Sequence, residues 1–132
     1  MKTKLIMLAH GSSNSSWSDA FFIMTQSVRA DCADADLAFM ELSTPDLFDA
    51  CRSAAKEGYE AIRVLPLFLA IGRHLKKDVP AMIETLQAEL DIPIKLLPPI
   101  GEHPALRKAI HEIVCDEVKP WLSSELVEDK NA

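Results

Sequence analysis

Short, continuous runs of apolar residues alternate along this chain with longer segments in which apolar residues recur every three or four positions. Four runs have the length and composition of strands that are buried on both faces: residues 4–9, 36–42, 61–69 and 92–98. Four other segments have the spacing of amphipathic helices: residues 16–30, 44–58, 78–90 and 106–118. The pattern therefore predicts four strands, each followed by a helix.

Individual residues indicate where some of these elements begin and end. Ser15 or Ser16 can cap the first helix, and Pro45 suits the first turn of the second. Pro66 has no N–H to donate within a sheet, so the third strand is expected to leave the sheet near it. Pro120 is expected to break the last helix.

The order of the elements predicts the architecture. Alternating strands and helices with short connections are typical of a parallel α/β sheet with helices on both faces, which makes three layers, αβα. We expect the strand order 2-1-3-4, with the switch point between strands one and three, where ligands bind at the carboxyl ends. Residues 1–120 are expected to form a single domain, and residues 121–132 a polar, frayed tail.

The composition narrows the possible classes of protein. A chain of 132 residues is long enough for one domain with a core, since folding at this size buries roughly 70% of the surface. Fourteen Lys and Arg against twenty Asp and Glu give a net charge of −6, so the overall field repels nucleic acid and anionic membranes. We therefore expect neither as a partner, and an anionic ligand must be held by local chemistry.

The hydrophobic runs and the cysteines favour the cytoplasm. No run approaches the ~18 apolar residues of a membrane span, and the apolar run at residues 5–9 is shorter than the ~7 to 15 residues of a signal peptide. Cys32, Cys51 and Cys115 are odd in number and form no C-x-x-C pair. We expect all three to be small residues of the core.

Three residues suited to metal binding or proton transfer follow the first three predicted strands: His10, Glu41 and His74. Neighbouring strands lie ~4.8 Å apart, so the topology brings these residues to one edge of the sheet. Two imidazoles and a carboxylate there predict a metal or proton-transfer site.

Structural alternatives remain open: a hydrogen bond to a loop carbonyl for His10, and solvated side chains for Glu41 and His74. His103 and His111, near or on the last helix, are expected away from this edge in structural roles.

Two other groups of residues are candidates for binding an anion. Ser12 and Ser13 are small enough for a ligand to approach the backbone just before a helix, where N–H groups are unpaired. Arg73, Lys76 and Lys77 form a local positive cluster in an acidic chain. An ordinary serine cap and a solvated helix face are the structural alternatives.

Three stretches carry a resemblance to a known family: LIMLAHGS, FMELSTPDL and VLPLFLAIGRHLKKDVP. They resemble the class II chelatases, in particular the short, single-domain sirohydrochlorin cobaltochelatases of the CbiX type, over about residues 4–115. The resemblance implies a lyase that inserts a divalent metal, Co²⁺ or alternatively Fe²⁺ or Ni²⁺, into sirohydrochlorin or a similar tetrapyrrole, in cobalamin or sirohaem biosynthesis. The metal is then a substrate, and no permanently bound cofactor is implied.

The same resemblance implies roles for residues and a partner. It implies catalysis and metal binding at His10 and His74, with Glu41 as a third metal-site residue, in a chelatase fold of two four-stranded units that face each other across the tetrapyrrole cleft. One unit per chain then implies a homodimer. The tract after His10 lacks the arginine often found there in related proteins, and no Gly-rich phosphate loop with its lysine is present, which is consistent with an ATP-independent reaction.

Two other functions compete with the enzyme. A tetrapyrrole or metal carrier with this fold needs the cleft but has no need of both histidines. A hydrolase with Ser12 as nucleophile needs a nucleophile elbow and an Asp-His relay, which the sequence does not display.

Overall fold

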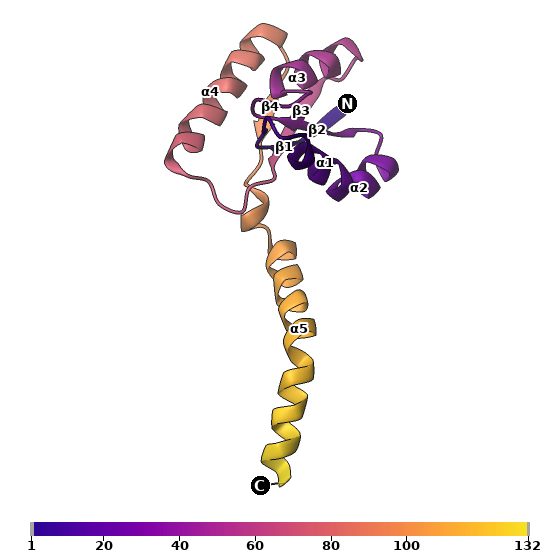
Figure 1. The fold of residues 1–132 in the computed structure, drawn as a ribbon. Coiled ribbons are helices and arrows are strands. Elements are labelled where there is room, and N and C mark those ends of the chain that lie inside the picture. Colours follow the sequence, from indigo (N-terminus) through magenta and orange to yellow (C-terminus); the bar gives the residue numbers. More distant parts are fainter. Residues whose placement is uncertain (1, 132) are drawn as a thin grey trace.

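The computed structural model describes the backbone of residues 2–131 and the side chains of residues 2–73 and 75–121. Its sheet has four parallel strands in the order β2-β1-β3-β4: β1 (Thr3–Ala9), β2 (Ala35–Phe39), β3 (Ala61–Pro66) and β4 (Ile94–Leu96). The helices are α1 (Ser15–Met24), α2 (Gln26–Asp31), α3 (Leu47–Lys56), α4 (Arg73–Leu90), the short 3-10 helix η1 (Ile100–Glu102) and α5 (Pro104–Asn131). The α/β class, the parallel sheet and its 2-1-3-4 order are confirmed (Figure 1).

The sheet separates two clusters of buried residues, because successive side chains of a strand point to opposite faces. On one face, Leu8 of β1 lies in the cluster that includes Leu86 of α4. On the other face, Met7 of β1 and Phe39 of β2 belong to a second cluster, against which Phe22 of α1 packs. Helices therefore lie on both faces of the sheet, and β1 is buried between them.

The second face is covered over only half of its width. Within the described part of the chain no helix lies across the β3 and β4 half, where Arg63 and Lys95 are exposed and Leu65 and Leu97 are half-buried. The last helix, α5, leads away from the rest of the molecule (Figure 1) and packs mainly against η1. The amphipathic pattern of residues 106–118 thus marks a helix that does not return to its own sheet.

The first predicted helix is in fact two helices. Asn14 caps α1 by accepting a hydrogen bond from the Ser16 N–H at 3.0 Å, so neither serine expected as the cap takes that role. The helix is interrupted at Thr25, whose hydroxyl donates to the Phe21 carbonyl at 2.8 Å. Such hydroxyl contacts with the preceding turn bend helices.

Other boundaries also differ from the prediction. Pro45 precedes the cap of α3, which is Asp46, and does not lie in the first turn. The helix α4 begins at Arg73, five residues earlier than the apolar spacing predicts, because its first turns carry mostly exposed polar side chains. Pro66 is the last residue of β3, as expected.

Two further predictions concern the end of the chain and the cysteines. Pro120 lies inside α5, so the predicted break there is wrong, while the frayed tail at residues 121–132 stays a prediction. Cys51 is buried, but Cys32 and Cys115 are exposed, so the expected core position is wrong for two of the three cysteines. Among the described residues, no helix has the length and apolar character needed to cross a membrane.

Candidate active site

His10 lies at the carboxyl end of β1, next to β3 at the switch point of the sheet. Its imidazole stacks on the ring of Phe68, with ring centroids 4.5 Å apart and an interplanar angle of 28°. Phe68 itself is only 4% exposed, whereas His10 is exposed. The Trp17 indole N–H donates to the His10 carbonyl at 2.7 Å. The imidazole is therefore held on a firm apolar support with access to solvent.

Close backbone contacts bring Glu41 to the same edge. A Cβ atom on Gly11 would lie 1.4 Å from the Glu41 carbonyl oxygen, so only glycine permits this approach. Ser43 fastens the two loops, because the Ser12 N–H donates to its Oγ at 3.1 Å and its hydroxyl donates to the Ser12 carbonyl at 3.0 Å. The loops that follow β1 and β2 thus form one structure, with the exposed Glu41 beside the segment that carries His10.

Glu41 was expected at the end of the second strand, but β2 ends at Phe39. The Phe39 N–H donates to the Pro45 carbonyl at 2.9 Å, and the chain turns at Leu42, which has a φ of 63°. The acid therefore comes from a turn that bends back over β2.

The loop after β3 joins this edge through Phe68 and continues to α4. The Gly101 N–H of η1 donates to the Phe68 carbonyl at 3.0 Å, and a Cβ on Gly101 would lie 1.6 Å from the Leu69 carbonyl oxygen. All four loops at the carboxyl edge are consequently in contact with a neighbour. The loop ends at Gly72, the residue that caps α4.

His74 is the second residue of α4, six positions after Phe68 in the chain. Its side chain lies outside the described side chains. The side chains of Arg73, Lys76 and Lys77 are exposed in the first two turns of α4. Gly72 has no side chain that could cap the helix, so the first N–H groups of α4 are uncapped. These N–H groups and the positive cluster both adjoin the edge that carries His10.

In the segment of Ser12 and Ser13, the polar groups of Ser12 form hydrogen bonds within the chain. The Ser12 N–H already donates to Ser43, and the Ser12 hydroxyl accepts from the Asn14 N–H at 3.1 Å. Ser13 is exposed between them. A ligand at this segment would therefore meet the Ser12 hydroxyl and the backbone of Ser13, not the Ser12 N–H.

The predicted metal ligands come together in part. Backbone contacts place His10 and Glu41 on neighbouring loops, and His74 begins the helix that the third loop leads into. Among the described side chains, no group of three or more His, Cys, Asp or Glu is placed to hold a metal. A three-residue metal site, with His74 as its third member, stays a prediction.

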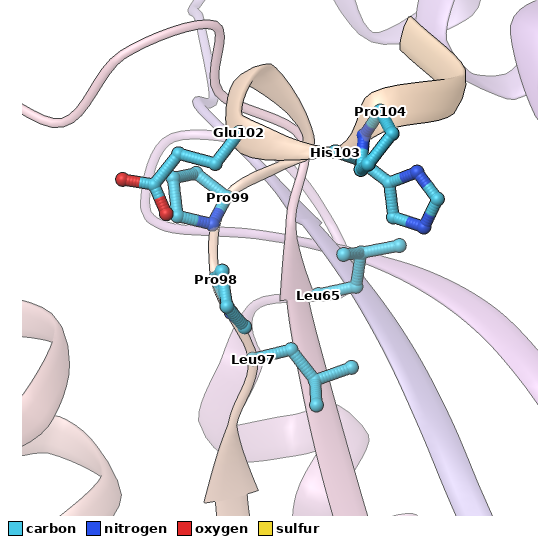
Figure 2. A pocket seen from close by; sticks show the side chains of 7 residues that line it. All are labelled: Leu65, Leu97, Pro98, Pro99, Glu102, His103 and Pro104. Atoms are coloured by element: carbon cyan, nitrogen blue, oxygen red, sulfur yellow. The ribbon is translucent and has the colours of Figure 1, made fainter.

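His103 follows η1 on the β4 side of the sheet, whereas His10 follows β1, and β3 lies between these two strands. The His103 Nδ1 accepts a hydrogen bond from the Ala105 N–H at 3.0 Å, which fits the structural role expected for it. Figure 2 shows the imidazole beside Leu65, at an apolar hollow of about 280 Å³. His111 lies on α5, within 3.5 Å of the Cys115 sulfur.

Sequence reasoning missed the residues that position the site. Trp17 and Phe68 support His10, while Ser43 and Gly101 fasten the loops. Phe68 belongs to a quoted motif and could have been noticed there. Trp17 lies within the apolar spacing of residues 16–30, but it is 45% exposed, and its indole N–H donates to the His10 carbonyl.

The fold and the site define a doubly wound α/β protein with a histidine at its switch point and a positive cluster in the first turns of α4. The sequence profile of the CbiX family matches residues 4–117 of this chain. The chain belongs to the CbiX family.

Curated relatives match two thirds of the chain or more. A sirohydrochlorin cobaltochelatase of Sulfurisphaera tokodaii is 28% identical over 120 residues, which cover 91% of this chain and 94% of that relative. A sirohydrochlorin cobaltochelatase of Methanopyrus kandleri is 31% identical over 111 residues, covering 68% of this chain and 75% of the relative.

Solved structures share the fold. A protein described as a cobalamin (vitamin B12) biosynthesis CbiX protein, from Marinobacter aquaeolei VT8, is 43% identical with a TM-score of 0.84, covering 89% of this chain and 98% of that one. The sirohydrochlorin chelatase SirB from Bacillus subtilis subspecies spizizenii, in complex with cobalt, is 25% identical with a TM-score of 0.75. The match covers 88% of this chain but only 51% of that chain.

Proposed function

We propose that this chain is a metal chelatase, a lyase that inserts Co²⁺ into sirohydrochlorin without ATP. The observation that carries the proposal is the exposed His10 imidazole, fixed on Phe68 at the switch point of a CbiX-family fold. Relatives that align over two thirds of the chain or more are named sirohydrochlorin cobaltochelatases, which supports the substrate and the reaction.

The chemistry of insertion suits imidazole. Two pyrrole N–H protons must leave the tetrapyrrole, and the metal must exchange water for the macrocycle nitrogens. A neutral imidazole can bind the metal or accept a proton near neutral pH. We assign these two tasks to His10 and His74, and we assign Glu41 to orienting a histidine, binding the metal or taking up a proton.

Co²⁺ is the metal that the relatives' names and the cobalt complex of SirB support. Fe²⁺ and Ni²⁺ also accept imidazole ligands, so they are alternative substrates. The metal enters as substrate, with no permanently bound cofactor. The family name and the description of the Marinobacter protein favour cobalamin over sirohaem biosynthesis.

The tetrapyrrole carries many carboxylates, whereas the chain has a net charge of −6. Short-range contacts must therefore overcome long-range repulsion. We assign them to Arg73, Lys76 and Lys77, whose exposed side chains adjoin the site, and to the segment at Ser12 and Ser13.

We further propose that the enzyme is a homodimer in the cytoplasm, with its cleft between the two carboxyl edges. The match to 51% of the longer SirB chain supports one unit per chain here and a second copy across the cleft. The free Cys32, Cys51 and Cys115 are consistent with a reducing compartment.

The test follows the absorbance of sirohydrochlorin under anaerobic conditions with Co²⁺, Fe²⁺ or Ni²⁺. We expect the chain to accelerate insertion above the uncatalysed rate, and His10→Ala and His74→Ala each to lose most of that acceleration. His111→Ala, a matched change at an exposed histidine of α5, should retain it. A carrier would instead bind the tetrapyrrole without turnover, and two fully active histidine variants would refute the assigned roles.

A further inference from the structure

Two leucines beside the candidate active site have exposed side chains. Leu42, in the loop after β2, is 72% exposed, and Leu69, in the loop after β3, is 74% exposed. Leu42 directly follows Glu41, whose carbonyl group lies against the segment that carries His10. Leu69 directly follows Phe68, on whose ring the imidazole stacks. The two leucines therefore adjoin the site from two separate loops.

Folding alone does not account for the conformation of Leu42. Its φ of 63° lies in the left-handed region, where a Cβ atom comes too close to the following carbonyl oxygen. Glycine adopts this conformation without that penalty. The Leu42 side chain is mostly exposed, so its burial offsets little of the cost. Strained residues of this kind are concentrated at functional sites.

The backbone of Leu69 is held as closely as that of Leu42. A Cβ atom on Gly101 would lie 1.6 Å from the Leu69 carbonyl oxygen, and the Gly101 N–H donates to the Phe68 carbonyl at 3.0 Å. The loop is thus packed against η1 while its leucine stays in water. An apolar side chain in this position is removed from water only when another molecule covers it.

The ligand of the proposed function has a matching division of apolar and charged parts. The macrocycle of sirohydrochlorin is flat and apolar on its faces, and its carboxylates lie on short arms around the rim. At the site, Leu42 and Leu69 are the apolar groups beside His10, and the exposed positive cluster lies at the start of α4. A few charged groups around an apolar surface are typical of sites for such ligands.

We propose that Leu42 and Leu69 bind the flat face of the tetrapyrrole and hold the centre of the ring at His10. The apolar contacts orient the ring itself, while the positive cluster binds the carboxylates at its rim. The inference rests on the proposed function, to which it adds the residues that bind the macrocycle.

Binding of metal-free sirohydrochlorin to the full chain tests this role, with the absorbance of the tetrapyrrole as the signal under anaerobic conditions. Leu42→Ala and Leu69→Ala should each raise Kd about 3- to 10-fold, because each removes part of the apolar contact. Leu42→Met and Leu69→Met keep a flexible apolar side chain and should stay within about 2-fold of the parent Kd. Ile23→Ala, at a 72% exposed residue of α1, is the matched control. A parent-like Kd in both leucine-to-alanine variants would overturn the proposal.

Salt separates the leucines from the positive cluster. Apolar contacts are not screened, so the ratio of the Kd of Leu69→Ala to the parent Kd should be the same at low and high salt. A ratio that falls to one at high salt would mean that the change acts through the carboxylates, against the proposal.

The strain at Leu42 provides a measurement that a merely structural role would not reproduce. Leu42→Gly should raise the melting temperature by about 2–5 °C, because it removes the left-handed penalty, and should raise Kd as much as Leu42→Ala does. Leu42→Ala keeps the Cβ atom and should leave the melting temperature nearly unchanged. A Leu42→Gly protein that is less stable and binds as the parent does would exclude Leu42 from the site.

Two controls distinguish the possible failures. Light scattering should give the same oligomeric state for the parent and the leucine variants; dissociation of the variants would assign the leucines to a contact between copies and overturn the proposal. Chelatase activity is measured separately on the parent. An active parent whose leucine variants bind normally refutes the leucine contacts and leaves the proposed function standing. A parent that binds through the leucines but inserts no metal does the reverse.

Discussion

The imidazole of His10 lies on the ring of Phe68, with centroids 4.5 Å apart, so a loop residue after β1 is supported by a buried residue after β3. The strand order makes this contact possible, because β1 and β3 are neighbours although more than fifty residues separate them. The contact fixes the plane of the ring. Among the described side chains, none forms a hydrogen bond with an imidazole nitrogen of His10.

Phe68→Leu should reduce kcat for metal insertion by about 2- to 10-fold, with a smaller change in KM. An aromatic pair is worth about 0.5–1.5 kcal/mol beyond its buried area, and its loss releases the imidazole from a fixed orientation. Steady-state kinetics with Co²⁺ and sirohydrochlorin measure both constants. Phe48→Leu, the same change on α3, is the control for general destabilisation; an equal kcat loss there would contradict a specific role for Phe68.

Gly11→Ala should lower the thermal stability and reduce activity at least 10-fold. The new Cβ would lie 1.4 Å from the Glu41 carbonyl oxygen, so the loops after β1 and β2 must move apart. Overpacking of this kind costs about 1–3 kcal/mol. Thermal unfolding measures the stability, and Gly72→Ala is the comparison, because its Cβ meets nothing within 4 Å. Equal losses of melting temperature in both variants would exclude the close approach as the cause.

The combined change Arg73→Ala, Lys76→Ala and Lys77→Ala should raise KM for the tetrapyrrole about 10-fold at low salt and leave kcat nearly unchanged. Exposed charges contribute about 0.2–1 kcal/mol each, and salt screens them. The dependence of KM on salt concentration should therefore flatten. Lys76→Ala alone can be compared with Lys56→Ala, which removes one exposed lysine on α3. Kinetics that do not distinguish these two lysines would refute the cluster as the carboxylate site.

The fold was predictable because the signals that carry it are local and repeated. Continuous apolar runs identified all four strands, and their alternation with helices set the parallel order 2-1-3-4. Errors came where one polar contact overrides the pattern. The Thr25 hydroxyl donates a hydrogen bond to the preceding turn and divides the predicted helix in two. The apolar run of the second strand continues to Leu42, but β2 ends at Phe39.

For the site, the sequence predicted which residues follow the strands but not which residues contact one another. His10 followed from the end of an apolar run, but its support by Phe68 depends on a contact between distant segments. The direction of α5 could not be read from its apolar spacing, because a helix that covers its own sheet and one that leads away from it have the same pattern. The start of α5 is determined instead by the His103 cap and the close approach at Gly101.

Two of the three cysteine thiols should react quickly with a thiol reagent, and the third should react slowly. Cys32 and Cys115 are exposed, whereas burial raises the pKa of the Cys51 thiol to about 12. Since the thiolate is the reactive form, Cys51 should react with Ellman's reagent only when the protein unfolds. Two equivalents should be released from the native protein and three in urea. Cys51→Ala should abolish the third equivalent; three fast thiols in the native protein would show that Cys51 is accessible.

Because of the ion pair between Lys4 and Asp36, we expect the free energy of unfolding to depend on pH in the alkaline range. Burial lowers the pKa of Lys4, but the hydrogen bond and the charge of Asp36, 2.6 Å away, together outweigh it and raise this pKa above 10.5. A raised pKa in the folded state stabilises the protein fully below the unfolded value. The stabilisation is then lost as the pH rises through the folded value.

Asp36→Asn should therefore lower the free energy of unfolding by about 1–2 kcal/mol at pH 8, since it leaves the ammonium group without its charged partner. The difference from the parent protein should shrink only as the pH rises above about 10.5, because Lys4 then loses its proton in the unfolded chain and, at higher pH, in the folded parent protein. Urea unfolding at several pH values measures this difference. Asp19→Asn, at an exposed carboxylate of α1, should show no such trend. A difference that stays constant up to about pH 12 would mean that Asp36 stabilises the fold by packing and not through the charge of Lys4.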